Sequence, residues 1–192
     1  MKLSEDEGKF LLDLARKTVK TYLEEGKVLK IDPSDVPSKT LIEERACFVT
    51  LYKGGKLRGC IGSLEPSKPL VFDVIDNALR AAFEDPRFHP VEINELDELE
   101  FSVSVLTVPE KVKIRSESEL LEKLVPRKHG LIIKKGVARA TFLPTVWEQI
   151  PEKEEFLSHL CMKAGLLPRE WKNAAGMEFY FYEAQEFKQS PS

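Results

Sequence analysis

A cysteine set between two glycines is the residue whose surroundings most suggest chemistry. Residues 56–62 read Lys-Leu-Arg-Gly-Cys-Ile-Gly, so Gly59 and Gly62 leave little side-chain bulk around the Cys60 thiol. A thiolate is a strong nucleophile, and a nearby cation raises the thiolate fraction by lowering the thiol pKa from its ordinary value of about 8.5. Arg58 would supply that cation, and the segment therefore predicts an accessible, activated cysteine.

The position of this thiol depends on a β-hairpin. Residues 46–52 form an apolar, β-branched run, a Lys-Gly-Gly turn follows, and residues 56–62 continue as the second strand. Because side chains alternate along a strand, we expect Arg58 and Cys60 on one face, about 7 Å apart, and Leu57 with Ile61 on the other.

A structural interpretation of the same residues stays open. Cysteine often serves as a small core residue, and we expect that role for Cys47 and Cys161. A glycine within a strand often marks a bulge or a close approach of two backbones, without any chemistry.

The second unusual segment is Asp85-Pro86-Arg87-Phe88-His89-Pro90. The two prolines restrict the backbone of a short loop that presents an acid, a cation and an imidazole. Arg87 could grip a carboxylate or phosphate, and His89 could act as an acid or base. Alternatively, Asp85 and Arg87 brace the loop through backbone hydrogen bonds and His89 is incidental. His129, at a turn before an apolar strand, is a third proton-transfer candidate or a surface turn residue.

The composition and the absence of several known motifs argue against some classes of function. The 192 residues carry a net charge of −3 and no dense Lys/Arg block, which disfavours a nucleic-acid partner. The sequence contains no P-loop, Gly-x-Gly-x-x-Gly, Cys-x-x-Cys or His-Glu-x-x-His pattern, so we predict no cofactor and no metal site.

Cysteine usage and apolar patterning indicate the compartment. The three cysteines are unclustered, no apolar run is long enough to span a membrane, and the N-terminal residues lack the hydrophobic segment of a signal peptide. We therefore expect a cytoplasmic protein without a membrane span. The abundance of Glu and Lys is typical of thermophilic proteins.

Hydrophobic periodicity indicates a mixed α+β fold, mainly antiparallel, with flanking helices. A capping-box pattern at Ser4 and Glu7 opens a helix that Gly26 ends, and a helix after Pro69 has its polar face at Asp73, Asp76, Asn77 and Arg80. Further helices are expected at 116–124, 144–150 and 154–164, and further strands at 101–107, 130–135, 137–142 and 178–187. With no credible linker, residues 1–192 are predicted to form a single domain.

Several ordered motifs make the chain resemble the AMMECR family. They include Phe48-Val49-Thr50-Leu51, Leu57-Arg58-Gly59-Cys60-Ile61-Gly62, Asp85-Pro86-Arg87-Phe88, His129-Gly130-Leu131 and Lys163-Ala164-Gly165-Leu166. The resemblance implies an antiparallel α+β fold with two unequal lobes in one compact unit, and the hairpin near a groove between them. It implies no settled activity. Microbial members resemble one component of a system with a Memo-type protein and a radical S-adenosylmethionine (SAM) protein, and animal members are associated with nuclear and regulatory roles.

The leading hypothesis is an enzyme or enzyme component that uses Cys60. Arg58, Gly59, Gly62 and Arg87 would contact the substrate, and His89 or His129 would move protons. The alternative is a non-catalytic module that binds protein or nucleic acid through an Arg-lined groove. A third hypothesis is an assembly role in which the hairpin forms a dimer edge.

Overall fold

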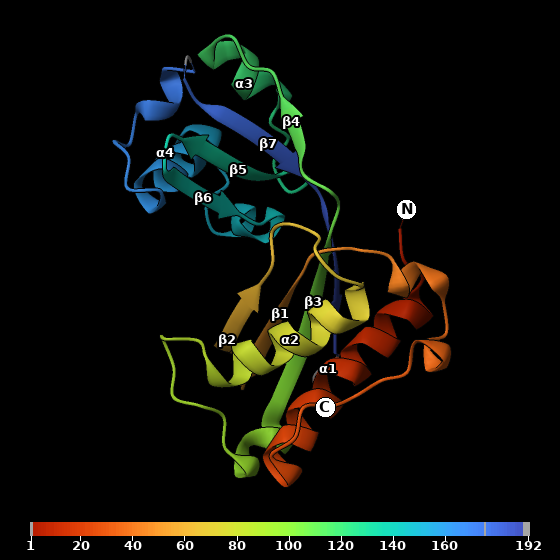
Figure 1. Cartoon of the computed structure of the whole chain (residues 1–192). Coiled ribbons are helices and arrows are strands. Elements are labelled where there is room, and N and C mark those ends of the chain that lie inside the picture. The colour runs from red at the N-terminus through yellow and green to blue at the C-terminus, as the bar shows by residue number, and fades with distance from the viewer. Residues whose placement is uncertain (1, 175, 190–192) are drawn as a thin grey trace. The chain divides into compact units, whose positions relative to one another are not determined.

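The computed structural model describes residues 2–174 and 176–189, and the chain divides into two compact units (Figure 1). The first unit runs to Leu106 and resumes at Gln185, and the second comprises Thr107–Ala184. Each unit has a four-stranded antiparallel sheet with flanking helices. The predicted α+β class is therefore confirmed, whereas a single domain over 1–192 stays a prediction.

In the first unit the strand order is β2-β1-β3-β8. The strands are β1 (Cys47–Lys53), β2 (Lys56–Gly62), β3 (Leu99–Leu106) and β8 (Ala184–Lys188). Helices α1 (Glu5–Glu25) and α2 (Leu70–Phe83) lie beside each other and pack on this sheet (Figure 1). The predicted hairpin is present, and β1 lies inside the sheet, as its continuous apolar run predicts.

The boundaries of α1 follow the predicted caps. The Ser4 side chain accepts a hydrogen bond from the Glu7 backbone, and the Glu7 carboxylate accepts one from the Ser4 backbone. Gly26 ends the helix with φ of 66°, a left-handed conformation that costs glycine little.

Helix α2 differs from its sequence prediction, because two residues of its expected polar face are buried. Asp73 and Asn77 are only 2% and 1% exposed. Asp73 accepts hydrogen bonds from the Cys47 backbone at 2.9 Å and from the Ser63 hydroxyl at 2.8 Å, and Asn77 donates to Asp73 at 3.0 Å. These polar side chains face inward because they satisfy the backbone N–H and C=O of Cys47 at the start of β1 and bind the Ser63 hydroxyl just after β2.

The connections of the first unit contain three 3₁₀ helices that the sequence prediction lacked. They are η1 (Pro33–Asp35), η2 (Lys39–Ile42) and η3 (Ile93–Glu98). The last of them lies in the long connection from α2 to β3, which also contains the Asp85–Pro90 segment.

The second unit has the strand order β4-β7-β5-β6. Its strands are β4 (Glu110–Val112), β5 (Gly130–Lys135), β6 (Ala138–Phe142) and β7 (Glu178–Tyr182). Its helices are α3 (Glu117–Lys123), η4 (Pro144–Glu148), α4 (Lys153–Lys163) and η5 (Glu170–Lys172). A stacked pair, Trp147 on Phe156 with 3.7 Å between ring centroids, lies in its core.

The predicted strand at 178–187 is wrong as a single element. The chain leaves β7 after Tyr182 and enters β8 at Ala184, and these two strands belong to different sheets. The aromatic residues at 179–182 and at Phe187 suggested one strand, although polar residues stand where it breaks, at Glu183, Gln185 and Glu186.

Candidate functional site

The hairpin brings Thr50 directly opposite Cys60. The register pairs Leu51 with Gly59 but Tyr52 with Leu57, so Arg58 is an extra residue in β2. Such a β-bulge bends the strand and redirects the side chains next to it.

Because of the bulge, the side chains of β2 do not alternate between the two faces of the sheet as the sequence predicts. Leu57 lies opposite Tyr52, which shares its face of β1 with Thr50, the partner of Cys60. The expectation that Leu57 shares a face with Ile61 is therefore wrong, because strict alternation does not continue through a bulge.

Arg58 binds a carboxylate, not the thiol. Its guanidinium donates to both carboxylate oxygens of Glu95, at 3.1 and 2.9 Å, and to the carbonyl oxygen of His89 at 2.9 Å. The Arg58 and Glu95 side chains are 15% and 17% exposed. Hydrogen bonding to Arg58 lowers the Glu95 pKa from 4.5 to about 2. The expected role of Arg58 as the cation beside Cys60 stays a prediction, because these hydrogen bonds engage its guanidinium with Glu95 and His89.

The Cys60 thiol is partly buried and contacts a hydroxyl group. The Thr50 hydroxyl donates to the Cys60 Sγ at 3.2 Å. A hydrogen bond donated to sulfur favours its ionised form. Cys47 and Cys161 are both 0% exposed, as expected of core residues, and burial raises the pKa of each thiol. Cys60 is thus the accessible thiol of the three.

An ion pair holds the backbone of Cys60 from the open side of β2. The Asp85 carboxylate accepts the Cys60 N–H at 2.9 Å, and the Arg87 guanidinium donates to the Cys60 carbonyl oxygen at 3.2 Å. Asp85 and Arg87 also bind each other through two hydrogen bonds of 2.9 and 2.7 Å. We call Asp85 and Arg87 the clamp. It occupies backbone groups that an edge strand otherwise exposes.

The clamp also sets the charge next to Cys60. Hydrogen bonding to Arg87 holds the pKa of Asp85 well below its usual range, and the Asp85 side chain is 2% exposed. The Arg87 pKa is raised, chiefly by its hydrogen bond to Asp85 and in smaller part by the charge of the Cys60 side chain. Arg87 is therefore a cation that interacts electrostatically with Cys60.

The two glycines beside Cys60 accommodate the protein's own atoms. A Cβ at Gly59 would lie 2.1 Å from the Ala81 carbonyl oxygen, and one at Gly62 would lie 2.2 Å from the Phe48 ring. The close backbone approach anticipated for strand glycines holds at Gly59, where β2 meets α2. A substrate-binding role for either glycine stays a prediction.

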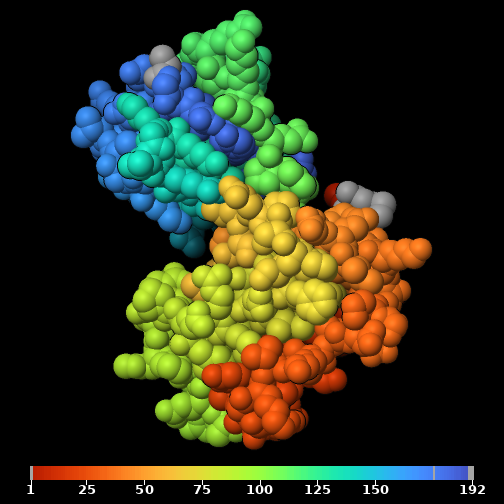
Figure 2. Space-filling view, in the orientation of Figure 1, coloured from red at the N-terminus to blue at the C-terminus, as the bar shows by residue number. Residues whose placement is uncertain are grey.

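The clamp belongs to a surface loop that also carries Phe88 and His89. The connection from α2 to β3 lies on the surface of the first unit, in yellow-green in Figure 2. The Phe88 ring lies near both guanidinium groups, 6.0 Å from that of Arg58 and 5.5 Å from that of Arg87. The His89 side chain is exposed. The backbone carbonyl oxygen of His89, and not its imidazole ring, accepts the hydrogen bond from Arg58. Its proposed acid or base role is untested.

His129 belongs to the second unit, and its proposed proton-transfer role stays a prediction. Its Nδ1 accepts from the Val125 backbone at 3.2 Å, and its carbonyl oxygen accepts from the Trp147 indole at 2.7 Å. Its ring lies 4.9 Å from the Phe181 ring. Burial lowers the His129 pKa from its usual value, with a smaller effect of Lys128. Within its own unit, His129 holds a turn against the core.

Sequence reasoning missed Thr50 and Glu95 as members of this site. The hairpin register could have revealed Thr50, because a turn at Gly54 and Gly55 places it near Cys60. No local signal indicates Glu95, which meets Arg58 through folding of a long loop.

Two features are absent from the described residues: a cluster of metal-ligating side chains and a membrane-spanning helix. No group of three or more His, Cys, Asp and Glu side chains is placed to hold a metal ion. Over the same part of the chain, no helix has the length and apolar character needed to cross a membrane.

Several known proteins similar to this chain come from archaea. Protein MK0488 from Methanopyrus kandleri is 43% identical, over 98% of this chain and 91% of its own length. A protein from Methanosarcina mazei is 44% identical, over 97% and 94%. The crystal structure of the uncharacterized protein PH0010 from Pyrococcus horikoshii matches with a TM-score of 0.91 at 37% identity, covering 100% of this chain and 95% of that one. The relatives include proteins of thermophilic archaea.

A family model described as AMMECR1 matches residues 12–187, which include the hairpin, the clamp and His129. The match covers most of both units, and the similar proteins align over nearly their full lengths. The chain belongs to the AMMECR1 family.

Proposed function

We propose that this protein is an enzyme or an enzyme component in which Cys60 forms a covalent thiol adduct. The observation that supports it is the clamp. A buried carboxylate and an arginine fix both backbone groups of Cys60, while its side chain stays partly accessible beside a hydroxyl donor. Fixing the backbone of a nucleophile favours reaction, because less orientational freedom is lost in the transition state.

The reaction class is acyl or alkyl transfer to the Cys60 thiol. The thiolate forms a carbon–sulfur bond, the leaving group departs with its electron pair, and the thiol proton has already gone to solvent or to a base such as His89. Arg87, whose side chain is 53% exposed, would bind an anionic group of the substrate.

The proposed partners are a Memo-type protein and a radical SAM protein, carried over from the family resemblance. The test is co-expression with both partners, acid quenching, and mass spectrometry of the peptide that contains Cys60. We expect a mass increase on this peptide that is absent when the protein is expressed alone. Cys60→Ser should abolish the increase, whereas Cys161→Ala, which removes a buried thiol, should retain it.

Two outcomes would reject the covalent role. One is an unmodified Cys60 peptide in the presence of both partners. The other is an equal mass increase in Cys60→Ser, which would place the adduct on another residue.

The rival function is a non-catalytic binding module. The placement of Phe88 near two guanidinium groups favours it, because guanidinium groups bind carboxylates and phosphates and the ring adds an apolar surface beside them. In that case Arg87→Glu should abolish co-purification of a partner and Cys60→Ser should not. A steep loss of binding with salt would indicate a phosphate-rich partner, since phosphate contacts release counterions.

A further inference from the structure

The open edge of the first sheet at β8 carries unpaired backbone groups. The Gln189 N–H donates to the Phe101 carbonyl oxygen at 3.0 Å, so alternate residues of β8, including Phe187, direct their backbone groups toward β3. Glu186 and Lys188 consequently direct their N–H and C=O groups away from the sheet. In the described part of the chain, no backbone hydrogen bond outside the sheet itself satisfies them. This edge is a template for one more strand.

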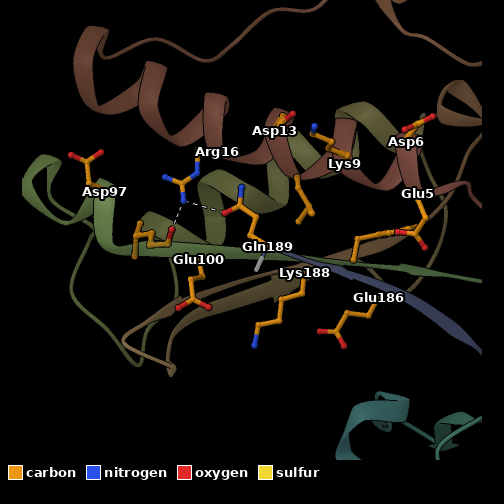
Figure 3. A pocket seen from close by; sticks show the side chains of 13 residues that line it. Glu5, Asp6, Lys9, Asp13, Arg16, Asp97, Glu100, Glu186, Lys188 and Gln189 are labelled. Atoms are coloured by element: carbon orange, nitrogen blue, oxygen red, sulfur yellow. Dashed lines mark hydrogen bonds between the residues drawn. The ribbon is translucent and has the colours of Figure 1, made fainter. Parts of the chain in front are cut away.

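A groove of about 750 Å³ runs along this edge, between α1 and the ends of β3 and β8 (Figure 3). Leu12, Leu99 and Phe187 form an apolar floor, but they are only 8%, 1% and 6% exposed, so the floor offers little apolar contact. All residues that line the groove belong to the first unit. The outward backbone donors and acceptors of β8 are therefore the main feature of the groove that supports strand addition.

The charged residues that line the groove indicate which kind of ligand is complementary to it. Six carboxylates line it, against three cations: Glu5, Asp6, Asp13, Asp97, Glu100 and Glu186, with Lys9, Arg16 and Lys188. No ion pair among the described residues neutralises any of the six. Arg16 already donates to the Leu96 and Leu99 carbonyl oxygens and to Gln189. The groove is thus acidic, and a cationic ligand is electrostatically complementary to it.

We propose that this groove binds an extended, basic segment of another protein, which adds to β8 as a fifth strand of the first sheet. Alternate side chains of such a segment would face the apolar floor and the carboxylates. A second copy of this chain fits less well, because two-fold pairing of β8 would bring the acidic residues of two α1 helices together. The site lies at the sheet edge opposite β2, so it is independent of the proposed role of Cys60.

The probes are hexapeptides in which lysine alternates with valine, leucine, threonine or phenylalanine, and their glutamate counterparts. Binding is followed by NMR of the ¹⁵N-labelled full chain. At least one lysine peptide should shift the Glu186 and Lys188 amide signals and slow their hydrogen exchange, and the glutamate peptides should do neither. Glu100→Gln should weaken binding by about threefold. Glu24→Gln, on α1 but outside the groove, should have no effect.

A pair of variants separates strand addition from charge attraction. Lys188→Gln and Lys188→Pro both remove a cation, which alone would strengthen binding of a basic peptide. Only Lys188→Pro removes the outward N–H, and it should weaken binding about tenfold relative to Lys188→Gln. Because this N–H does not face β3, the ladder between β3 and β8 is retained.

Three results would overturn the proposal. They are no binding of any lysine peptide, equal binding to Lys188→Pro and Lys188→Gln, and concentration-dependent dimerisation by light scattering that Lys188→Pro abolishes. The last result would make a second copy of this chain the occupant. None of them bears on the reactivity of Cys60.

Discussion

At the scale of single residues, two arginines on neighbouring segments have different roles. Arg58 is held by the Glu95 carboxylate, whereas Arg87 holds the backbone of Cys60 and remains half exposed. The sequence places Arg58 nearer to the thiol, but distance along a strand does not decide which partner a long side chain reaches. Arg87 therefore lies where it can influence Cys60 electrostatically.

The Arg58–Glu95 pair predicts a specific pH dependence of stability. The folded-state pKa of Glu95 is about 2 and its usual value is 4.5. Since the folded value is the lower one, Glu95 stabilises the native state above about pH 4.5, and this contribution is lost as pH falls toward 2. The shift corresponds to roughly 3 kcal/mol.

Urea unfolding of the wild type and Glu95→Gln measures this contribution. The wild type should be more stable at neutral pH, and the difference between the two should shrink toward zero near pH 2. A difference in the free energy of unfolding that is constant over this range would show that Glu95 does not titrate with a depressed pKa.

At the scale of elements, the meeting of β2 and α2 depends on Gly59. Its missing Cβ would lie 2.1 Å from the Ala81 carbonyl oxygen, which is helix backbone, whereas at Gly62 the obstacle is the Phe48 side chain. A ring can rotate, but a helix backbone cannot move without disturbing its own hydrogen bonds. The two glycines therefore differ in how much strain a methyl group would cause.

We predict that Gly59→Ala lowers the free energy of unfolding by about 3 kcal/mol and Gly62→Ala by about 1 kcal/mol. Chemical denaturation of both variants checks the order. If Gly62→Ala proves as destabilising as Gly59→Ala, the packing of α2 against β2 is not the limiting contact.

Much of the element order can be read from local sequence, and the failures have physical causes. The caps of α1 and the hairpin turn are local signals, and they predicted those elements correctly. Gly59 is a local signal of the adjacent bulge, but the extra residue, Arg58, becomes evident only when β2 pairs with β1. Asp73 and Asn77 looked solvent-facing, because their burial depends on partners distant in the sequence.

The residues of the candidate site also fall into those that the sequence indicated and those that it did not. Cys60, Gly59 and Arg87 were recognisable from residue types and spacing, but their partners were not. The Asp85 contact with the Cys60 N–H spans 25 residues, and the Arg58 contact with Glu95 spans 37. Such contacts depend on the path of the loop between α2 and β3, which hydrophobic periodicity does not encode.

At the scale of the whole molecule, the second unit is an insertion between two strands of the first sheet. The chain enters at Thr107 and leaves at Ala184, and these ends are adjacent. The Thr107 N–H donates to the Glu183 carbonyl oxygen, and the Glu183 N–H donates to the Thr107 hydroxyl, both at 2.9 Å. This unit has a hydrophobic core of its own, built around Trp147 and Phe156. Closely spaced ends and a separate core are typical of a segment that can be excised.

We therefore predict that residues 107–184 fold when expressed alone. Both tryptophans, Trp147 and Trp171, lie within this segment, so fluorescence reports its core directly. The fragment should show blue-shifted emission and a cooperative urea transition, and Phe156→Ala should lower its stability by about 3 kcal/mol. Emission typical of solvated tryptophan without a transition would show that this unit needs the rest of the chain.

The proposed function requires the Cys60 thiol to be accessible to solvent and to interact with the Arg87 cation. The most direct test is the rate of iodoacetamide alkylation of each cysteine in the native protein, followed by peptide mapping. Cys60 should react at least about tenfold faster than Cys47 and Cys161, because thiolate character and exposure control the rate. Arg87→Gln should slow Cys60 alkylation, and Arg58→Gln, the matched control, should not. Equal rates at all three cysteines, or alkylation of Cys60 only after unfolding, would contradict the proposed role of Cys60 as a nucleophile.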